Sequence, residues 1–133
     1  RGLFRSAHNL ETVRRLEGVR DARASTDKSL RTLRLAKAAG VPLTKSSLLL
    51  GLGERREEVL CAMDELRAAC VDVLVLGQYL RPSAKQVPVA EYVHPDVFAE
   101  YAELGKARGF SSVVSGPFAR TSYHAMEAWE GRS

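Results

Sequence analysis

The chain has 133 residues, of which 45% are hydrophobic and 27% are charged, and its formal charge at neutral pH is +4. This length suits a single domain, and the content of Leu, Val and Ala excludes a disordered chain. Basic residues are interspersed with acidic ones instead of forming a concentrated patch, so we expect no nucleic-acid partner. No apolar stretch is long enough to cross a bilayer, so we expect no membrane partner either.

The middle of the chain alternates between helical and strand patterns. Apolar residues at three- and four-residue steps predict helices over 27–39 and 57–69. Residues 43–50 and the β-branched run 71–76 have the length and composition of strands. Because a strand, a helix and a second strand follow one another, this part of the chain predicts a βαβ unit and a parallel sheet.

The flanking segments are less regular. Two prolines within 77–91 indicate a long loop of the kind that often carries function. We expect one or two helical turns over 11–16 after a strand end near His8, a helix over 95–109, a strand over 110–114 and a turn or short helix over 120–129. Together the patterns predict one α/β domain over 1–133 with about three strands, in which 115–133 form a C-terminal tail.

The two cysteines, Cys61 and Cys70, lie nine positions apart in or beside an apolar-periodic stretch. We expect both thiols to be reduced and buried, because free cysteine behaves as a small hydrophobic residue. Their spacing fits neither a disulfide framework nor a metal site, and it is typical of an intracellular protein.

Parallel α/β sheets bind ligands at the carboxyl ends of their strands, so the residues after each predicted strand are candidates for a site. Gly51 and Gly53 permit positive φ angles just before a helix, where free N–H groups attract anions. The same pattern fits an ordinary strand–helix turn, and His8 equally fits a structural, hydrogen-bonded histidine. The residues by themselves leave these alternatives open.

A series of short motifs, in order and over nearly the whole chain, resembles the C-terminal half of lipoyl synthase. The most specific are Gly77-Gln78-Tyr79-Leu80 and Arg120-Thr121-Ser122-Tyr123. The other matching segments are 8–13, 19–21, 28–30, 44–46, 51–54, 76–82, which contains the first of these two motifs, and 115–117.

The resemblance implies a radical S-adenosylmethionine enzyme whose fold is a partial parallel (β/α) barrel, of which this chain is the C-terminal part. Such an enzyme uses S-adenosylmethionine and two [4Fe–4S] clusters to insert two sulfur atoms, at C6 and C8 of an octanoyl chain. Its partner is the octanoylated lipoyl domain or carrier protein. The family implies the mitochondrial matrix or the bacterial cytoplasm, with a plastid as a further option.

This chain departs from the family in one respect. The family holds its clusters with a CxxxCxxC motif and a second cysteine triplet, and neither is present here. Because iron–sulfur clusters need closely set thiolates, we expect a C-terminal portion that is inactive alone. Two alternatives remain: a nucleotide-binding α/β module without radical chemistry, and an interaction domain that retains a degenerate enzyme fold.

The resemblance also implies roles for single residues at the strand ends. Asn9 is expected to contact S-adenosylmethionine, and Arg20 to grip its methionyl carboxylate. The other expected roles are backbone approach to the adenosyl group at Gly51 and Gly53, a cavity wall at Gln78 and Tyr79, turn-fixing by Glu54 and a barrel-facing amine at Lys45. Tyr79 equally fits a core residue. Independently of the resemblance, Glu11 fits a structural residue that caps the following turn.

In the family, a serine hydroxyl of the C-terminal Arg-Ser-Ser-Tyr motif ligates the auxiliary cluster. Here Thr121 replaces the first serine, so Ser122 is the expected ligand and Thr121 the alternative. Arg120 is expected to balance the charge of the cluster.

Overall fold

The computed structural model describes residues 5–20 and 23–120 and confirms the α/β class. Its elements, in chain order, are β1 (Arg5–Ala7), the 3-10 helix η1 (Arg14–Val19), α1 (Thr26–Ala38), β2 (Leu43–Leu50), α2 (Arg56–Ala68), β3 (Val73–Gln78), α3 (Pro95–Ala107) and β4 (Ser112–Ser115).

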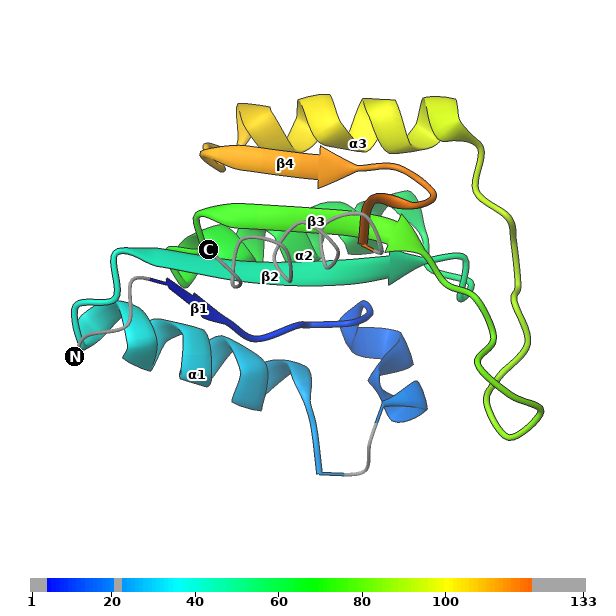
Figure 1. Cartoon of the computed structure of the whole chain (residues 1–133), viewed down its shortest axis with the longest axis horizontal. Helices are drawn as coiled ribbons and strands as arrows, with labels where there is room; N and C mark the ends of the chain where they lie inside the picture. The colour runs from blue at the N-terminus through cyan, green and yellow to red at the C-terminus, as the bar shows by residue number, and fades with distance from the viewer. Residues whose placement is uncertain (1–4, 21–22, 121–133) are drawn as a thin grey trace, which may run out of the picture.

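Within the described residues the strands form one parallel sheet in the order β1-β2-β3-β4 (Figure 1). The expectation of about three strands is therefore wrong, because β1 adds a fourth. β1 ends at Ala7, so the strand end expected near His8 is confirmed, but the three residues of β1 are too few to show a two-residue alternation. Neighbouring strands are also consecutive in the chain, as in a β/α barrel.

The α-helices of the described residues, α1, α2 and α3, all pack against the same face of the sheet. Alternate strand residues, Leu48 and Leu50 on β2 and Leu74 and Leu76 on β3, are buried in one core with residues of each helix. The helices contribute Leu30 and Leu33 from α1, Val59, Met63 and Leu66 from α2, and Phe98 and Tyr101 from α3. On the opposite face a smaller cluster joins Val73, Val75 and Ala119.

The predicted boundaries agree with most elements to within one or two residues, and β2 has the predicted limits. β3 begins at Val73 instead of 71, because Cys70 turns the chain with a φ of 62°. The amide of Asp72 donates to the carbonyl of Thr44, but Asp72 itself precedes the strand. The helical turns expected over 11–16 lie at 14–19, since Glu11 instead forms a bridge with Leu48.

The prediction that both cysteines are buried is wrong, because Cys61 and Cys70 are exposed. The buried face of α2 consists of Val59, Ala62, Met63 and Leu66, and Cys61 lies off this face, with its thiol 3.8 Å from Glu65. Cys70 lies in the left-handed turn that follows the helix. The apolar periodicity of α2 therefore does not extend to either thiol.

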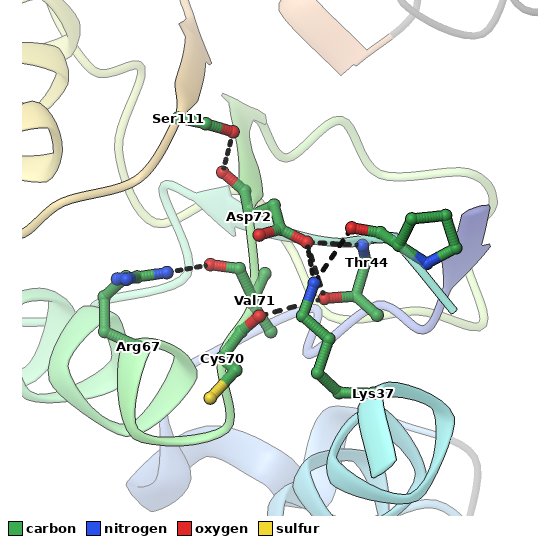
Figure 2. Close-up of polar contacts among 8 residues, drawn as sticks. Lys37, Thr44, Arg67, Cys70, Val71, Asp72 and Ser111 are labelled. Atoms are coloured by element: carbon green, nitrogen blue, oxygen red, sulfur yellow. Dashed lines mark hydrogen bonds and ion pairs between the residues drawn. The ribbon is translucent and has the colours of Figure 1, made fainter. Parts of the chain in front are cut away.

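A polar network closes the amino-terminal end of the sheet (Figure 2). The carboxylate of Asp72 accepts bonds from Lys37 Nζ at 2.6 Å and from the amide of Thr44 at 2.8 Å, while its carbonyl accepts one from Ser111. The network thereby links α1, β2 and the starts of β3 and β4. In β/α proteins this end of the strands serves stability, and ligands bind at the other.

Candidate functional site at the carboxyl edge of the sheet

The strands of the sheet point toward one edge, where η1, the loop over 79–94 and the segment over 116–120 also lie (Figure 1). Two hollows open there, and both are lined by Glu11, Leu49, Tyr79 and Pro82. The Arg20 hollow, of about 350 Å³, adds Thr12, Val19, Arg20, Ala24 and Leu52. The Arg120 hollow, of about 340 Å³, adds Gln78, Leu80, Pro117 and Arg120.

Arg20 and Asn9, which the sequence indicated separately, are in direct contact. Arg20 Nη2 donates to the backbone carbonyl of Asn9 and to the hydroxyl of Ser29, each at 3.0 Å. Its Nη1 is buried and has no hydrogen-bond partner within the described part of the chain. Burial lowers the pKa of Arg20, and the negative charges of Glu11 and Glu17 oppose this effect. The guanidinium therefore keeps an N–H group that could donate a hydrogen bond to a carboxylate.

His8 lies close enough to Arg20 for their charges to interact. Burial lowers the pKa of His8, and the positive charge of Arg20 lowers it further. Its Nδ1 is buried without a hydrogen-bond partner among the residues that the structure describes. The neutral imidazole is consequently the favoured form in the folded chain.

The turn over 51–54 is held by its own acidic residue. The carboxylate of Glu54 accepts the amides of Gly51, at 3.0 and 3.1 Å, and of Leu52, at 2.9 Å, so its expected role in fixing the turn is confirmed. Gly51 and Gly53 both have a φ of 101°. Since a side-chain carboxylate already occupies the amides of Gly51 and Leu52, these groups do not form an empty anion site.

Gly51 is also closely approached by other parts of the chain. A Cβ at this position would lie 2.3 Å from both Gln78 Nε2 and the carbonyl of Glu91. The Gln78 side chain donates to the carbonyls of Tyr79 and Glu91 and accepts the amide of Val93. Gln78 thus ties the end of β3 to the loop that follows it.

Tyr79 shapes the wall shared by the two hollows. Its ring is 7% exposed, its hydroxyl donates to the carbonyl of Val87 at 2.6 Å, and its amide donates to Leu50. Gln78 and Tyr79 both line the Arg120 hollow, and their expected place near a bound ligand stays a prediction.

Glu11 and Arg120 meet across the Arg120 hollow although 109 positions separate them in the sequence. Arg120 Nη1 lies 2.8 Å from Glu11 Oε2. The side chain of Glu11 was expected to cap the following turn, but the N-cap of η1 is Val13 and no side chain bonds there. Glu11 belongs to this edge instead.

Sequence reasoning missed Leu49, and it placed Pro82 and Pro117 in motifs without giving either a role in the hollows. Isolated apolar residues carry no chemical signature, and only the position of Leu49 near the end of a predicted strand could have indicated it. Lys45 is buried and lies three strand positions from Leu48, which faces the helices, so Lys45 faces the other side of the sheet.

The remaining predicted residues do not form a metal centre in the part of the chain that the structure describes. Within 5–20 and 23–120, no group of three His, Cys, Asp or Glu side chains could hold a metal ion. Thr121 and Ser122 lie outside the described residues. Among the described helices, none combines the length and the apolar character needed to cross a bilayer.

Comparison with known proteins gives close relatives. No family model matches the chain. Over 121 residues it is 51% identical to a protein named lipoyl synthase from Flavobacterium psychrophilum and 54% identical to a lipoyl synthase from Bacillus mycoides. It is also 49% identical, over 119 residues, to the mitochondrial lipoyl synthase of Nematostella vectensis.

These alignments cover about nine-tenths of this chain, which spans only about two-fifths of the length of each relative: 42%, 41% and 41%. The similarity to lipoyl synthases that the motifs indicated is confirmed.

Proposed function

We propose that this chain is the C-terminal portion of a lipoyl synthase. The parent enzyme inserts two sulfur atoms, at C6 and C8, into an octanoyl chain held on a lipoyl domain or carrier protein. The observation that carries this proposal is the identity of about one half with three lipoyl synthases over nine-tenths of the chain.

The carboxyl edge of the sheet has a donor set that suits S-adenosylmethionine. We assign the methionyl carboxylate to Arg20, whose Nη1 has no partner among the described residues, and a polar contact to Asn9 beside it. Gly51, Gly53 and Gln78 support the wall of the site by ordering the turn and the loop around it. When bound, S-adenosylmethionine supplies the 5′-deoxyadenosyl radical of this enzyme class.

The iron–sulfur clusters do not fit the residues of this chain alone. It contains two cysteines, and both lie at exposed positions of α2 and the turn after it. Cluster thiolates must therefore come from a different part of the parent enzyme, and the chain by itself is inactive in our proposal. Ser122 remains the proposed oxygen ligand.

The relatives include two bacterial proteins and one named mitochondrial. We accordingly assign the parent enzyme to the bacterial cytoplasm or the mitochondrial matrix. The proposed partner is an octanoylated lipoyl domain or carrier protein.

A chimera tests the proposal. Residues 1–133 would replace the matching C-terminal region of the Bacillus mycoides relative, and the chimera would be expressed in a bacterial strain that lacks lipoyl synthase. Growth without added lipoate is the expected result. The chimera that carries Arg20→Ala should grow less well. Arg31→Ala, on the exposed side of α1, is the matched control for this variant. Failure of a chimera that folds and binds both clusters would contradict the proposal.

The nucleotide-binding module is the second candidate, and the parallel sheet with its glycine turn favours it. Glu54 counts against it, because this carboxylate occupies amides that would otherwise hold a phosphate. Calorimetric titration of the 133-residue chain with ATP distinguishes the two: binding of ATP by the chain alone would favour the module.

A further inference from the structure

The segment that follows β4 is held tightly over the end of β3. The amide of Gly116 donates to the carbonyl of Leu76, and the amide of Gln78 donates to the carbonyl of Pro117. A Cβ at Gly77 would lie 3.0 Å from the Cβ of Arg120 and 3.3 Å from its amide nitrogen. This contact brings residues 116–120 across the edge of the sheet and places Arg120 at the Arg120 hollow.

Glu11 is held just as firmly at the other side of that hollow. Its amide donates to the carbonyl of Ser47 at 3.0 Å, and its carbonyl accepts the amide of Leu49 at 2.7 Å. Its φ is 70°, a left-handed conformation that a non-glycine residue adopts only when its surroundings impose it. These bonds to β2 impose that conformation and fix the Cα of Glu11 at the end of the strand.

The two side chains then span the gap. The carboxylate of Glu11 and the guanidinium of Arg120 lie 2.8 Å apart, and their side chains are 29% and 26% exposed. An ion pair this sheltered is screened less by solvent than a surface pair. The ion pair links the segment that follows β1 to the segment that follows β4. In the sheet, β1 and β4 are separated by β2 and β3.

We infer that Glu11 is a positioning residue whose ion pair with Arg120 clamps the segment over 116–120 across the carboxyl edge of the sheet, as a strap that forms one wall of the Arg120 hollow. The clamp itself follows from the contacts above. Its importance for activity rests on the proposed function, which puts the ligand site at this edge.

Trypsin tests the clamp directly, because Arg120 is itself a cleavage site and its guanidinium is engaged with Glu11. In the 133-residue chain, Glu11→Gln removes the charge and keeps the shape of the side chain. Cleavage after Arg120 is expected to rise roughly 5- to 30-fold, since proteolysis follows the population of the locally open form. Glu57→Gln, at an exposed position of α2, is the matched control and is expected to leave this rate unchanged.

Cleavage after Arg67, within α2, requires the helix to open and therefore reports on the rest of the fold. An unchanged rate there, with faster cleavage after Arg120, supports the strap. An equal rise at both sites would assign Glu11 to global stability and overturn the inference, and so would an unchanged rate at Arg120.

A charge swap gives a second, independent measurement. Arg120→Glu is expected to accelerate amide hydrogen exchange at Gly116 and Gln78, and adding Glu11→Lys is expected to restore the slow exchange. A double variant that exchanges as fast as the single one would overturn the clamp. If the chimera without any of these substitutions never supports growth, the proposed function is contradicted. The proteolysis result would remain valid in that case.

Discussion

Lys37 of α1 and Asp72 at the start of β3 form an ion pair, with Nζ 2.6 Å from Oδ2. The two side chains point toward one another at the amino-terminal end of the sheet, and the amide of Thr44 donates to the same carboxylate oxygen (Figure 2). One carboxylate thus ties a helix and two strands together at the end of the sheet remote from the candidate site.

Replacing Asp72 with Asn should destabilise the chain by about 1.5–3 kcal/mol, the range for hydrogen bonds to a charged group. The substitution keeps the volume and removes the charge that Lys37 requires. Urea unfolding followed by circular dichroism measures the change. Asp64→Asn, at an exposed position of α2, is the control and should cost less than 1 kcal/mol.

The contribution of Asp72 should also depend on pH. Burial raises its pKa, but the hydrogen bonds from Lys37 and Thr44 outweigh burial, so the pKa lies below its ordinary value. The folded state therefore holds the proton less well than the unfolded state. The stabilisation is complete above about pH 4 and is lost as the pH falls through the lower, folded pKa. The difference in unfolding free energy between the wild type and Asp72→Asn should shrink over that range, and a constant difference would contradict this assignment.

His8 should make the chain more stable at neutral than at mildly acidic pH. Because burial and Arg20 lower its pKa, the unfolded chain binds a proton at His8 more readily than the folded chain. Stability should be complete above about pH 6.5 and fall as the pH drops below it. His8→Gln should flatten the stability profile between about pH 5 and 7, as measured by urea unfolding at several pH values. An unaltered slope would show that His8 does not titrate differently in the two states.

Gly51→Ala should be far more damaging than Gly40→Ala. Both glycines have positive φ, 101° and 94°, but a Cβ at Gly40 meets nothing within 4 Å, whereas one at Gly51 would lie 2.3 Å from Gln78 and Glu91. Gly40→Ala should cost about 1 kcal/mol, the usual backbone penalty. Gly51→Ala should cost about 3 kcal/mol or more, because the loop must also move. Equal losses in thermal unfolding would show that the loop yields easily.

Arg20→Ala in the chimera should weaken S-adenosylmethionine binding by about 1.5–3 kcal/mol, since a charge-assisted hydrogen bond is lost. Arg20→Lys should recover only part of the affinity, because an ammonium cannot reproduce the planar pair of donors. Equilibrium binding in the absence of an electron donor measures the affinity without turnover. Arg31→Ala is the control, and an unchanged affinity in Arg20→Ala would remove Arg20 from the site.

The sequence by itself determined the α/β class and nearly all of the element boundaries. Periodicities of 3.6 and 2 residues are local properties, so Leu30 and Leu33 indicate a helix and 43–50 a strand before any long-range contact is considered. The strand-end rule then selected Asn9, Gly51 and Gln78 as candidates, and the family resemblance added Arg20. The family resemblance rested on motifs that are equally local.

Only the tertiary structure decided how those residues meet. The contact of Arg20 with Asn9, the use of Glu54 as the anion of its own turn, and the pairing of Glu11 with Arg120 all depend on how loops close and on the register between strands. The exposed thiol of Cys70 follows from where the last turn of α2 ends. A local pattern does not specify these contacts, because the free energy of each arises from groups that only the packed sheet brings within reach.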